Sequence, residues 1–199
     1  MLLRSFSRTD IRLIFLDIET TGFNVFKNNI IEIAAIDSNN IKFETLTNNN
    51  GKNIPKKISE LTNINNEMLL NQPTIEEVLV KFIDYLKMEN NNNTYLIGHN
   101  VNSFDLPFIK AQCQKYNLKF PDFKTIDTMR MSQYILKDQY YHNLGALSNL
   151  FGINNENAHR AMSDVYTTKI IFNNLCLLFK RDYGKCTPNI LYYRTTLFR

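Results

Sequence analysis

Three short apolar runs near the N-terminus are separated by polar segments and predict three β-strands. The run Ile11–Ile18 is apolar at most positions and rich in β-branched residues, a pattern typical of a buried central strand. The runs Ile30–Ile36 and Ile41–Thr47 predict a second and a third strand. Residues Asp37–Asn40 between them are of the types that favour tight turns, so we expect these two strands to form a hairpin.

After residue 70 the apolar positions change to helical spacing. Thr74–Met88 carries apolar residues three and four positions apart, which predicts an amphipathic helix, and Thr74 with Glu77 supplies a capping box at its start. Two short strands, over Thr94–Ile97 and Lys124–Ile126, are predicted to alternate with helices over Phe104–Tyr116, up to Leu136, over Leu144–Phe151 and over Arg160–Lys180. This order predicts an α/β fold in which helices cover a sheet, without an interdomain linker.

The composition predicts one domain inside a cell. A chain of 199 residues with 44% hydrophobic residues is long enough to bury a full-sized core. The three cysteines, Cys113, Cys176 and Cys186, are far apart and form no C-x-x-C pair, so we expect neither a disulfide framework nor a zinc knuckle. No apolar run is long enough for a signal peptide or a membrane span. We therefore expect an intracellular protein, cytoplasmic or nuclear and not secreted, that does not bind membranes.

The positive charge is concentrated at the C-terminus. The cations between Lys180 and Arg199, less Asp182, account for the whole formal net charge of +4. Three tyrosines and Phe198 are interleaved with them, a combination that suits nucleic acid because cations meet phosphates and rings stack on bases. The alternative is a solvated tail with some aromatic packing, which the composition alone favours. We therefore treat residues 181–199 as a basic, aromatic C-terminal tail.

The first chemical motif is Asp17-Ile-Glu19, at the end of the first predicted strand. Residues i and i+2 of a strand project from the same face, so Asp17 and Glu19 present two carboxylates in one direction. Unpaired carboxylates at the end of an apolar strand are unfavourable unless cations compensate them, and two divalent ions can be bridged by such a pair. Alone, the motif more often describes a strand end that faces solvent.

The second motif spans Gly98–Ile109, which follows a short strand and enters a helix. Pro107 is tolerated in the first turn of a helix, so Asp105 is expected near the helix N-terminus. The helix dipole there favours the ionised carboxylate that a metal ion needs. An acidic residue at this position can also serve the helix alone.

The third motif joins His159 to Asp164. Five residues of an ideal helix turn through about 500°, which leaves the two side chains about 140° apart. Both can reach one site only if His159 lies in the loop before the helix and Asp164 lies inside it. A loop histidine, with an unperturbed pKa of about 6.5, suits a general base. A surface histidine without a role is the alternative, and that description fits His142 better.

In this order the motifs resemble the DnaQ-like 3′→5′ exonucleases of the DEDDh type, among them the epsilon-type proofreading exonucleases of bacterial replicative DNA polymerases and the RNase T group. The resemblance covers roughly Ile11 to Phe179 and includes the connecting stretches 29–35, 61–68 and 143–152. Arg160 stands where the tyrosine subclass has its tyrosine. The resemblance implies an RNase H-like fold, with a mixed five-stranded sheet flanked by helices, in an exonuclease domain over residues 1–180.

The resemblance also implies the chemistry. Asp17, Glu19, Asp105 and Asp164 are expected to hold two Mg²⁺ or Mn²⁺ ions, with Asp17 bridging them. These hard cations prefer carboxylate and water oxygens. His159 is expected to take the proton of the attacking water. The products would be nucleoside 5′-monophosphates and a strand shortened from its 3′ end.

Further residues are implied for holding the last nucleotides. Contacts to the terminal sugar and base are expected from Ile18, Thr20, Thr21 and Phe23, a wedge against the last bases from Met68, and seating of the terminal nucleotide from Asn100 and Phe104. Stacking and phosphate contacts without reading of base edges predict a weak sequence preference. Met68 and Phe104 are also typical of plain core packing at these spacings.

Single-stranded nucleic acid is the expected partner, with DNA favoured over RNA because Thr20-Thr21-Gly22 resembles the DNA proofreaders slightly more. A polymerase or another replication or repair protein is a second expected partner, and the oligomeric state is not predicted. Three alternatives remain: an RNA-trimming 3′→5′ exoribonuclease, a catalytically silent nucleic-acid-binding or polymerase-partner module, and a structural domain with incidental acidic residues. The intact motifs argue against the last two, and metal-dependent turnover would separate them from an enzyme.

Overall fold

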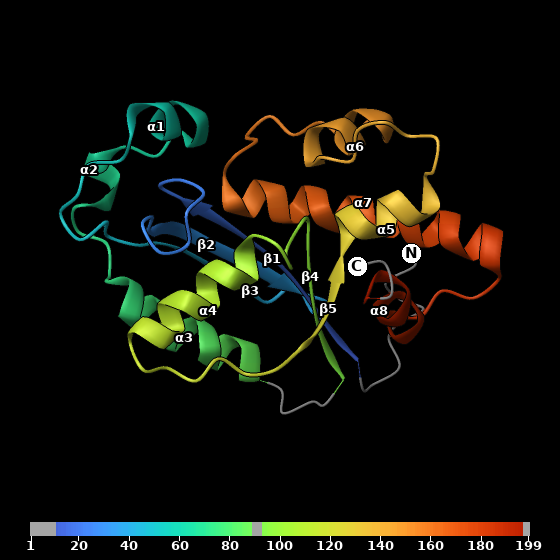
Figure 1. Ribbon diagram of the computed structural model, residues 1–199, viewed down its shortest axis with the longest axis horizontal. Helices are drawn as coiled ribbons and strands as arrows, with labels where there is room; N and C mark the ends of the chain where they lie inside the picture. The colour runs from blue at the N-terminus through green and yellow to red at the C-terminus, as the bar shows by residue number, and fades with distance from the viewer. Residues whose placement is uncertain (1–10, 89–92, 197–199) are drawn as a thin grey trace.

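A mixed sheet of five strands forms the centre of the molecule (Figure 1). The computed structural model describes residues 11–88 and 93–196. Residues 1–10, on which the prediction about a signal peptide depends, lie outside the described residues, and so does Phe198. The strands are β1 (Arg12–Thr20), β2 (Ile30–Asp37), β3 (Lys42–Leu46), β4 (Thr94–Gly98) and β5 (Lys124–Asp127), in the order β3-β2-β1-β4-β5. The pairs β1/β2 and β2/β3 are antiparallel, and the pairs β1/β4 and β4/β5 are parallel. The predicted mixed five-stranded α/β sheet is confirmed.

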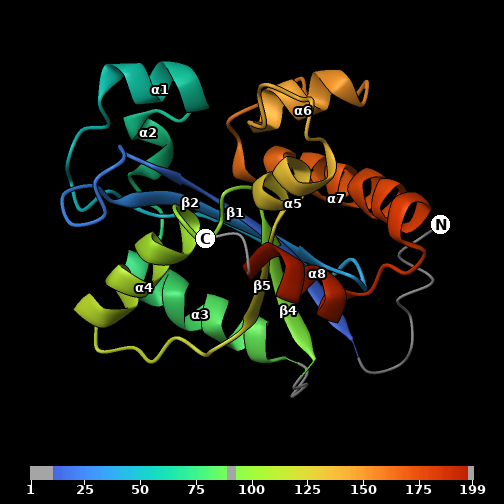
Figure 2. The ribbon, with the colours of Figure 1, turned by 45° about the vertical axis from the view of Figure 1, so that its right-hand side comes forward.

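Helices cover both faces of this sheet. The helices are α1 (Lys56–Thr62), α2 (Asn66–Leu69), α3 (Ile75–Lys87), α4 (Asp105–Lys115), α5 (Thr128–Ile135), α6 (Leu144–Leu150), α7 (Ala161–Tyr183) and α8 (Pro188–Thr196). One face is covered by α3 and α4, and the other by α5 and the long α7, with α6 outside them (Figures 1 and 2). The short helices α1 and α2 pack over a small apolar cluster that contains Ile31, Ile64 and Leu69.

The central strand β1 divides the core in two because its side chains alternate between the faces. Leu13 and Phe15 belong to the cluster shared with α7, whereas Ile14, Leu16 and Ile18 belong to the cluster shared with α3 and α4. Asp17 and Glu19 continue the first series. The sequence of β1 therefore directs both carboxylates to the α7 face of the sheet, at the strand's C-terminal end.

The opposite end of β1 carries a buried ion pair. Arg12 and Asp37, whose side chains are 1% and 0% exposed, lie 3.0 Å apart. Arg12 also donates to the carbonyl oxygens of Tyr85 and Leu86 at the end of α3. The other carboxylate oxygen of Asp37 accepts from the backbone of the β2–β3 turn, including the N–H of Ile41. The charges at this end are therefore paired and hydrogen-bonded within the fold, as buried charges require.

The predicted strands and helices are all present within a few residues, but α1, α2 and α8 were not predicted. The first two contain seven and four residues, too few to show a helical period. The segment expected as a C-terminal tail forms α8 instead, beside β5 and α5, and its Leu191 is 1% exposed. Ile190 and Tyr192 also pack against the cluster that contains Leu191, so the core contacts of α8 come from consecutive residues and show little helical period.

Candidate active site

The first motif brings two carboxylates to the end of the central strand. Asp17 and Glu19 are both partly exposed there, on the α7 face. The antiparallel register places Glu19 directly opposite Glu32 of β2. Three acidic side chains therefore lie on adjacent positions of two strands, at the point where α7 begins.

Asp105 approaches the same strand end from the other face. It is the first residue of α4, is 2% exposed, and accepts a hydrogen bond from the backbone N–H of Ile18 at 3.1 Å. The turn before it is tight, because a Cβ on Gly98 would lie 2.7 Å from the Cβ of Val101 and 3.1 Å from the carbonyl oxygen of Leu16. Glycine at position 98 thus lets the chain turn from β4 into α4 close to β1.

The third motif supplies two more groups. His159 lies in the loop before α7 with φ of 64°, and Asp164 lies in the first turns of α7, as the spacing of the two residues predicted. Asp164 accepts from the backbone N–H of His159 at 3.1 Å and from the side-chain amide of Asn155 at 2.7 Å. The imidazole of His159 is exposed, whereas Asp164 is 6% exposed. The loop is therefore fastened to the helix by the carboxylate of Asp164.

These elements converge on one point. One ligand atom from each of Glu19, His159 and Asp164 lies within 4.8 Å of the others. Asp17 and Asp105 complete what we call the carboxylate cluster, the group of Asp17, Glu19, Asp105 and Asp164. The cluster combines side chains from β1, α4 and α7, segments far apart in the sequence.

The electrostatics of the cluster are unfavourable in the absence of a cation. Burial, followed by repulsion from Asp105 and Glu19, raises the pKa of Asp17 well above its ordinary value. Burial and then repulsion from Asp164 raise the pKa of Glu19 to about 9, and burial raises the pKa of Asp105 to about 7. The pKa of Asp164 is also raised by burial, although its hydrogen bonds from Asn155 and His159 act in the opposite direction. Because burial disfavours ionisation of all four carboxylates, and repulsion within the cluster adds to this at Asp17 and Glu19, the cluster is suited to divalent cations.

Two residues beside the cluster were not assigned a role from the sequence. Glu32 is 1% exposed, and Arg160 binds it through its guanidinium at 2.8 Å. Glu32 lies in an apolar run that predicts a core strand, and the residue type of Arg160 only distinguishes the sequence from the tyrosine subclass. Their proximity is a tertiary contact, so nothing local in the sequence indicates it.

The motif order and the geometry both point to nuclease chemistry, and the comparison with known proteins decides the family. A model of the RNase_T family, described as exonuclease, matches residues 14–172. The chain belongs to this exonuclease family. The predicted resemblance to DnaQ-like 3′→5′ exonucleases is thereby confirmed.

Relatives of this chain include DNA polymerase III proteins and a 3′-5′ exonuclease. DNA polymerase III subunit epsilon of Aquifex aeolicus is 32% identical over 177 residues, which cover 86% of this chain and 84% of that protein. A DNA polymerase III PolC-type of Caldanaerobacter subterraneus subsp. tengcongensis is 36% identical over 162 residues, which cover 78% of this chain. The chain spans only 11% of the length of this PolC-type relative. The 3′-5′ exonuclease DinG of Bacillus subtilis is 32% identical, and its matched part covers 81% of this chain and 17% of that protein.

Solved exonuclease structures share the fold. E. coli exonuclease I in complex with a dT13 oligonucleotide has a TM-score of 0.75 at 17% identity, covering 87% of this chain and 43% of that one. Exonuclease X in complex with 5′ overhanging duplex DNA has a TM-score of 0.64 at 21% identity, covering 93% of this chain and 99% of that one. The predicted RNase H-like fold is therefore confirmed.

Among the described residues of this exonuclease-family chain, none of the helices is both long and apolar enough to cross a membrane.

The residues expected to hold substrate are placed in different ways. Phe23 is 83% exposed, and its ring lies 6.1 Å from that of Phe104, which is half-buried. The hydroxyls of Thr20 and Thr21 are used within their own loop, since Thr20 donates to the carbonyl of Gly22 and Thr21 accepts from the N–H of Asn29. Of the two aromatic residues predicted to contact the substrate, Phe23 is thus the more accessible.

The remaining predicted contacts differ in exposure. The side chain of Ile18 is 3% exposed and lies in the core. The predicted contact of Ile18 with the substrate therefore cannot come from an exposed side chain. Met68 is half-buried on α2. Asn100 has φ of 64°, and its backbone N–H donates to Asp127 at 3.0 Å. Asp127 also caps α5, so this buried carboxylate, which the sequence did not single out, fixes the loop that leads to Phe104.

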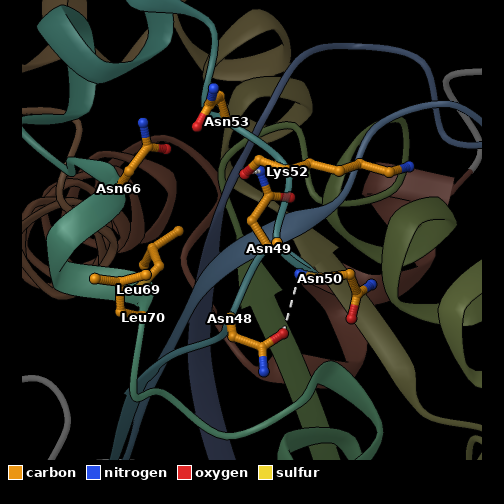
Figure 3. A pocket seen from close by; sticks show the side chains of 9 residues that line it. Asn48, Asn49, Asn50, Lys52, Asn53, Asn66, Leu69 and Leu70 are labelled. Atoms are coloured by element: carbon orange, nitrogen blue, oxygen red, sulfur yellow. Dashed lines mark hydrogen bonds between the residues drawn. The ribbon is translucent and has the colours of Figure 1, made fainter.

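A separate pocket of about 310 Å³ lies near α2 (Figure 3). It is lined by Asn48, Asn49, Asn50, Gly51, Lys52, Asn53, Asn66, Leu69 and Leu70. The amides around it are largely used to hold the chain: Asn48 accepts from the N–H of Asn50, and Asn66 accepts from the N–H of Ile54. Asn49 accepts from Asn29, the residue bonded to Thr21, so this loop supports the segment that carries Phe23.

Proposed function

We propose that the chain is a metal-dependent 3′→5′ exonuclease that acts on single-stranded nucleic acid, with DNA favoured over RNA, and releases nucleoside 5′-monophosphates. The observation that carries this proposal is the convergence of the carboxylate cluster with His159 at the end of β1. The relatives named as polymerase III proteins, and the exonuclease I structure with dT13, support DNA as the substrate.

The donor set suits two divalent cations, Mg²⁺ or Mn²⁺. All four members of the cluster offer hard carboxylate oxygens, and no cysteine thiolate among the described residues joins them in a metal-ligating group. The family resemblance implies that Asp17 would serve both ions, and in the structure each of the other three carboxylates raises the pKa of Asp17. When bound, such ions would polarise the scissile phosphate, lower the pKa of the attacking water and stabilise the leaving oxygen.

His159 is the proposed general base. Its imidazole is exposed beside Glu19 and Asp164, so it can accept a proton from the attacking water and release it to solvent. The attack forms a new bond to phosphorus and breaks the bond from phosphorus to the 3′ oxygen of the preceding nucleotide. The products are a nucleoside 5′-monophosphate and a strand that again ends in a 3′ hydroxyl.

The rings of Phe23 and Phe104 are proposed to stack on the last bases. Phe104 also contacts Phe108 at 5.1 Å between ring centroids, so the exposed ring of Phe23 rests on a continuous aromatic support. Thr20, Thr21, Ile18, Asn100 and Met68 remain predicted contacts, through backbone or side chain. Stacking tolerates every base, so the proposed enzyme has little sequence preference.

A second nucleic-acid contact is proposed at the C-terminal end of α7. A groove there is lined by four apolar or aromatic side chains and two cations: Phe179, Tyr183, Ile190 and Tyr193, with Lys185 and Arg194. Rings beside cations suit a single strand, and the net charge of the chain comes from this region. A polymerase or repair protein that occupies the groove is the alternative occupant.

Digestion of 5′-labelled single-stranded DNA and RNA of one sequence tests the proposal. The reactions contain Mg²⁺, Mn²⁺ or EDTA, and they include Asp17→Ala and His159→Ala beside Asp84→Ala, which removes an exposed carboxylate on α3. We expect a ladder that shortens from the 3′ end, is lost with EDTA and in the first two variants, and persists in Asp84→Ala. A faster RNA ladder would identify an exoribonuclease, and intact strands under every metal condition would leave a silent binding module.

A further inference from the structure

Arg160, the residue after His159, makes a contact outside the carboxylate cluster. Arg160 donates to Glu32 through Nε at 3.2 Å to Oε1 and 3.3 Å to Oε2, and through Nη2 at 2.8 Å to Oε1. A guanidinium held at both nitrogens fixes distance and orientation together, which a lysine cannot do. Both oxygens of Glu32 are therefore occupied by donors from the segment that follows His159.

Glu32 also caps α7 from a different part of the chain. Arg160 is the N-cap residue, and its own side chain makes no capping hydrogen bond. Instead, Oε2 of Glu32 accepts from the backbone N–H of Ala161 at 2.8 Å. The first N–H groups of a helix have no partner within the helix, so this bond supplies one of the missing acceptors.

The loop before α7 needs such support. His159 has a positive φ of 64°, a region that non-glycine residues populate sparsely and keep only when their surroundings hold them. On one side its N–H is bound by Asp164, and on the other side Arg160 is bound by Glu32. Because Glu32 pairs directly with Glu19 in the sheet register, it ties the loop to the same strand position that the imidazole faces.

We propose that Glu32, Arg160 and the N–H of Ala161 form a clamp that positions His159 over the carboxylate cluster. In this assignment Glu32 is a positioning residue and not a fifth ligand for a cation, since its charge is already paired with the guanidinium of Arg160. The inference rests on the proposed function, because it assigns the clamp a part in the same reaction.

The test is a double-mutant cycle on single-stranded DNA digestion with Glu32→Gln and His159→Ala. Glu32→Gln keeps the size of the side chain but loses one acceptor, and we expect it to lower kcat about 10- to 100-fold, the usual range for a supporting contact. KM and the Mg²⁺ concentration for half-maximal rate should change less than about threefold. In the His159→Ala background Glu32→Gln should have no further effect on kcat, because the group it positions is absent.

Arg160→Lys is the second variant, since it retains the cation, loses the fork and changes a side chain that is 32% exposed. It should lower kcat to a similar extent, again without effect in the His159→Ala background. Glu76→Gln is the matched control, because Glu76 is an exposed carboxylate on α3, away from the clamp, and it should leave kcat unchanged.

The outcomes separate the clamp from the proposed function. An inactive wild type would remove the exonuclease proposal itself. If the wild type is active, a Glu32→Gln variant that digests DNA as fast as Glu76→Gln would overturn the clamp. Additive losses with His159→Ala would show a general structural role. A rise in the Mg²⁺ requirement would show that Glu32 acts on cation binding and not on His159. Either result would also overturn the clamp.

Discussion

The two ends of strand β1 both carry buried acidic groups, but the fold treats them differently. At the N-terminal end Asp37 is fully buried and is paired with Arg12 at 3.0 Å. At the C-terminal end the four carboxylates of the cluster lie together, and the nearby Arg160 is engaged by Glu32. At the first end the acidic group has a cationic partner within the chain, and at the second end we propose that divalent cations supply the compensating charge.

The contrast shows how structural and functional charges can be told apart. The buried ion pair of Arg12 and Asp37 has both of its charges within the chain, and breaking such a pair leaves an uncompensated charge. Carboxylates that raise one another's pKa values oppose folding and persist because they serve another purpose. Here that purpose is the proposed binding of two cations.

The largest expected effect is on catalysis at the C-terminal end. Asp17→Asn should lower the rate of digestion at saturating Mg²⁺ by at least about 10⁴-fold, equivalent to about 5.5 kcal/mol, because the proposed shared ligand is lost. In EDTA the same variant should unfold at an equal or higher temperature, since one source of repulsion is removed. An active variant, or one that is destabilised in EDTA, would break the comparison.

The next effect is on stability at the N-terminal end. Asp37→Ala should lower the free energy of unfolding by about 3–5 kcal/mol, because Arg12 is left buried without its partner. Digestion per folded molecule should be unchanged. As a control, Glu60→Ala disrupts the exposed Lys56–Glu60 pair, at 3.7 Å, and should not move the unfolding midpoint measurably. Equal midpoints for both variants would show that the Arg12–Asp37 pair is not needed for stability.

The pH dependence of stability should come from the cluster. The pKa of Glu19 is raised to about 9 and that of Asp105 to about 7, so the folded chain retains protons that the unfolded chain releases from about pH 4 upward. In EDTA the stabilisation is complete at low pH and is lost as pH rises through these folded-state values. Between about pH 4 and its folded-state pKa, each such group should therefore lower the free energy of unfolding by roughly 1.4 kcal/mol per pH unit.

Chemical denaturation between pH 5 and pH 8.5 measures this slope. Saturating Mg²⁺ should flatten the profile because it favours the ionised carboxylates, and Asp17→Asn should reduce the slope in EDTA. A profile in EDTA that is flat, or that rises with pH, would contradict the assignment of raised pKa values to the cluster.

A smaller effect separates substrate holding from charge. Phe23→Ala should raise KM for single-stranded DNA about tenfold, since stacking on an aromatic ring contributes about 1–3 kcal/mol, while kcat changes little. Phe26→Ala is the matched control on the same loop, because Phe26 is 93% exposed. Equal KM values for the two variants would remove Phe23 from the proposed binding surface.

The smallest effect is expected at the groove between α7 and α8. Lys185→Gln combined with Arg194→Gln should weaken DNA binding a few-fold and reduce the salt dependence of affinity by up to about two counterions. Lys81→Gln with Lys87→Gln on α3 gives the control for surface charge. An unchanged salt dependence would indicate that the groove serves a protein partner or the fold alone. Substitution is preferable to truncation here, because removing α8 would expose the core around Leu191.

The sequence predicted the local features of the site well. Asp17 and Glu19 share a strand face, Asp105 begins a helix, and His159 precedes the helix that contains Asp164, all of which follow from short-range periodicity. The pairing of charges was not predictable in the same way. Glu32 and Arg160 are 128 positions apart, and Glu32 sits in a strand that otherwise reads as apolar core.

The C-terminal region shows the same limit. A basic, aromatic segment predicts solvent or nucleic acid, yet Leu191 inserts into the core and Tyr95 donates to Asn189. Both contacts depend on where α7 ends and the chain turns back, which is determined by tertiary packing. Composition indicated the charge of this segment correctly but could not indicate its helix.

Counting Mn²⁺ ions by electron paramagnetic resonance, in the presence of a nucleoside 5′-monophosphate, tests the central claim most directly. We predict two Mn²⁺ ions per wild-type chain, fewer than two in Asp17→Asn, and two in Asp84→Ala, the exposed control on α3. A folded wild-type chain that binds no Mn²⁺ at millimolar concentration would contradict the claim that the C-terminal end of β1 is completed by cations.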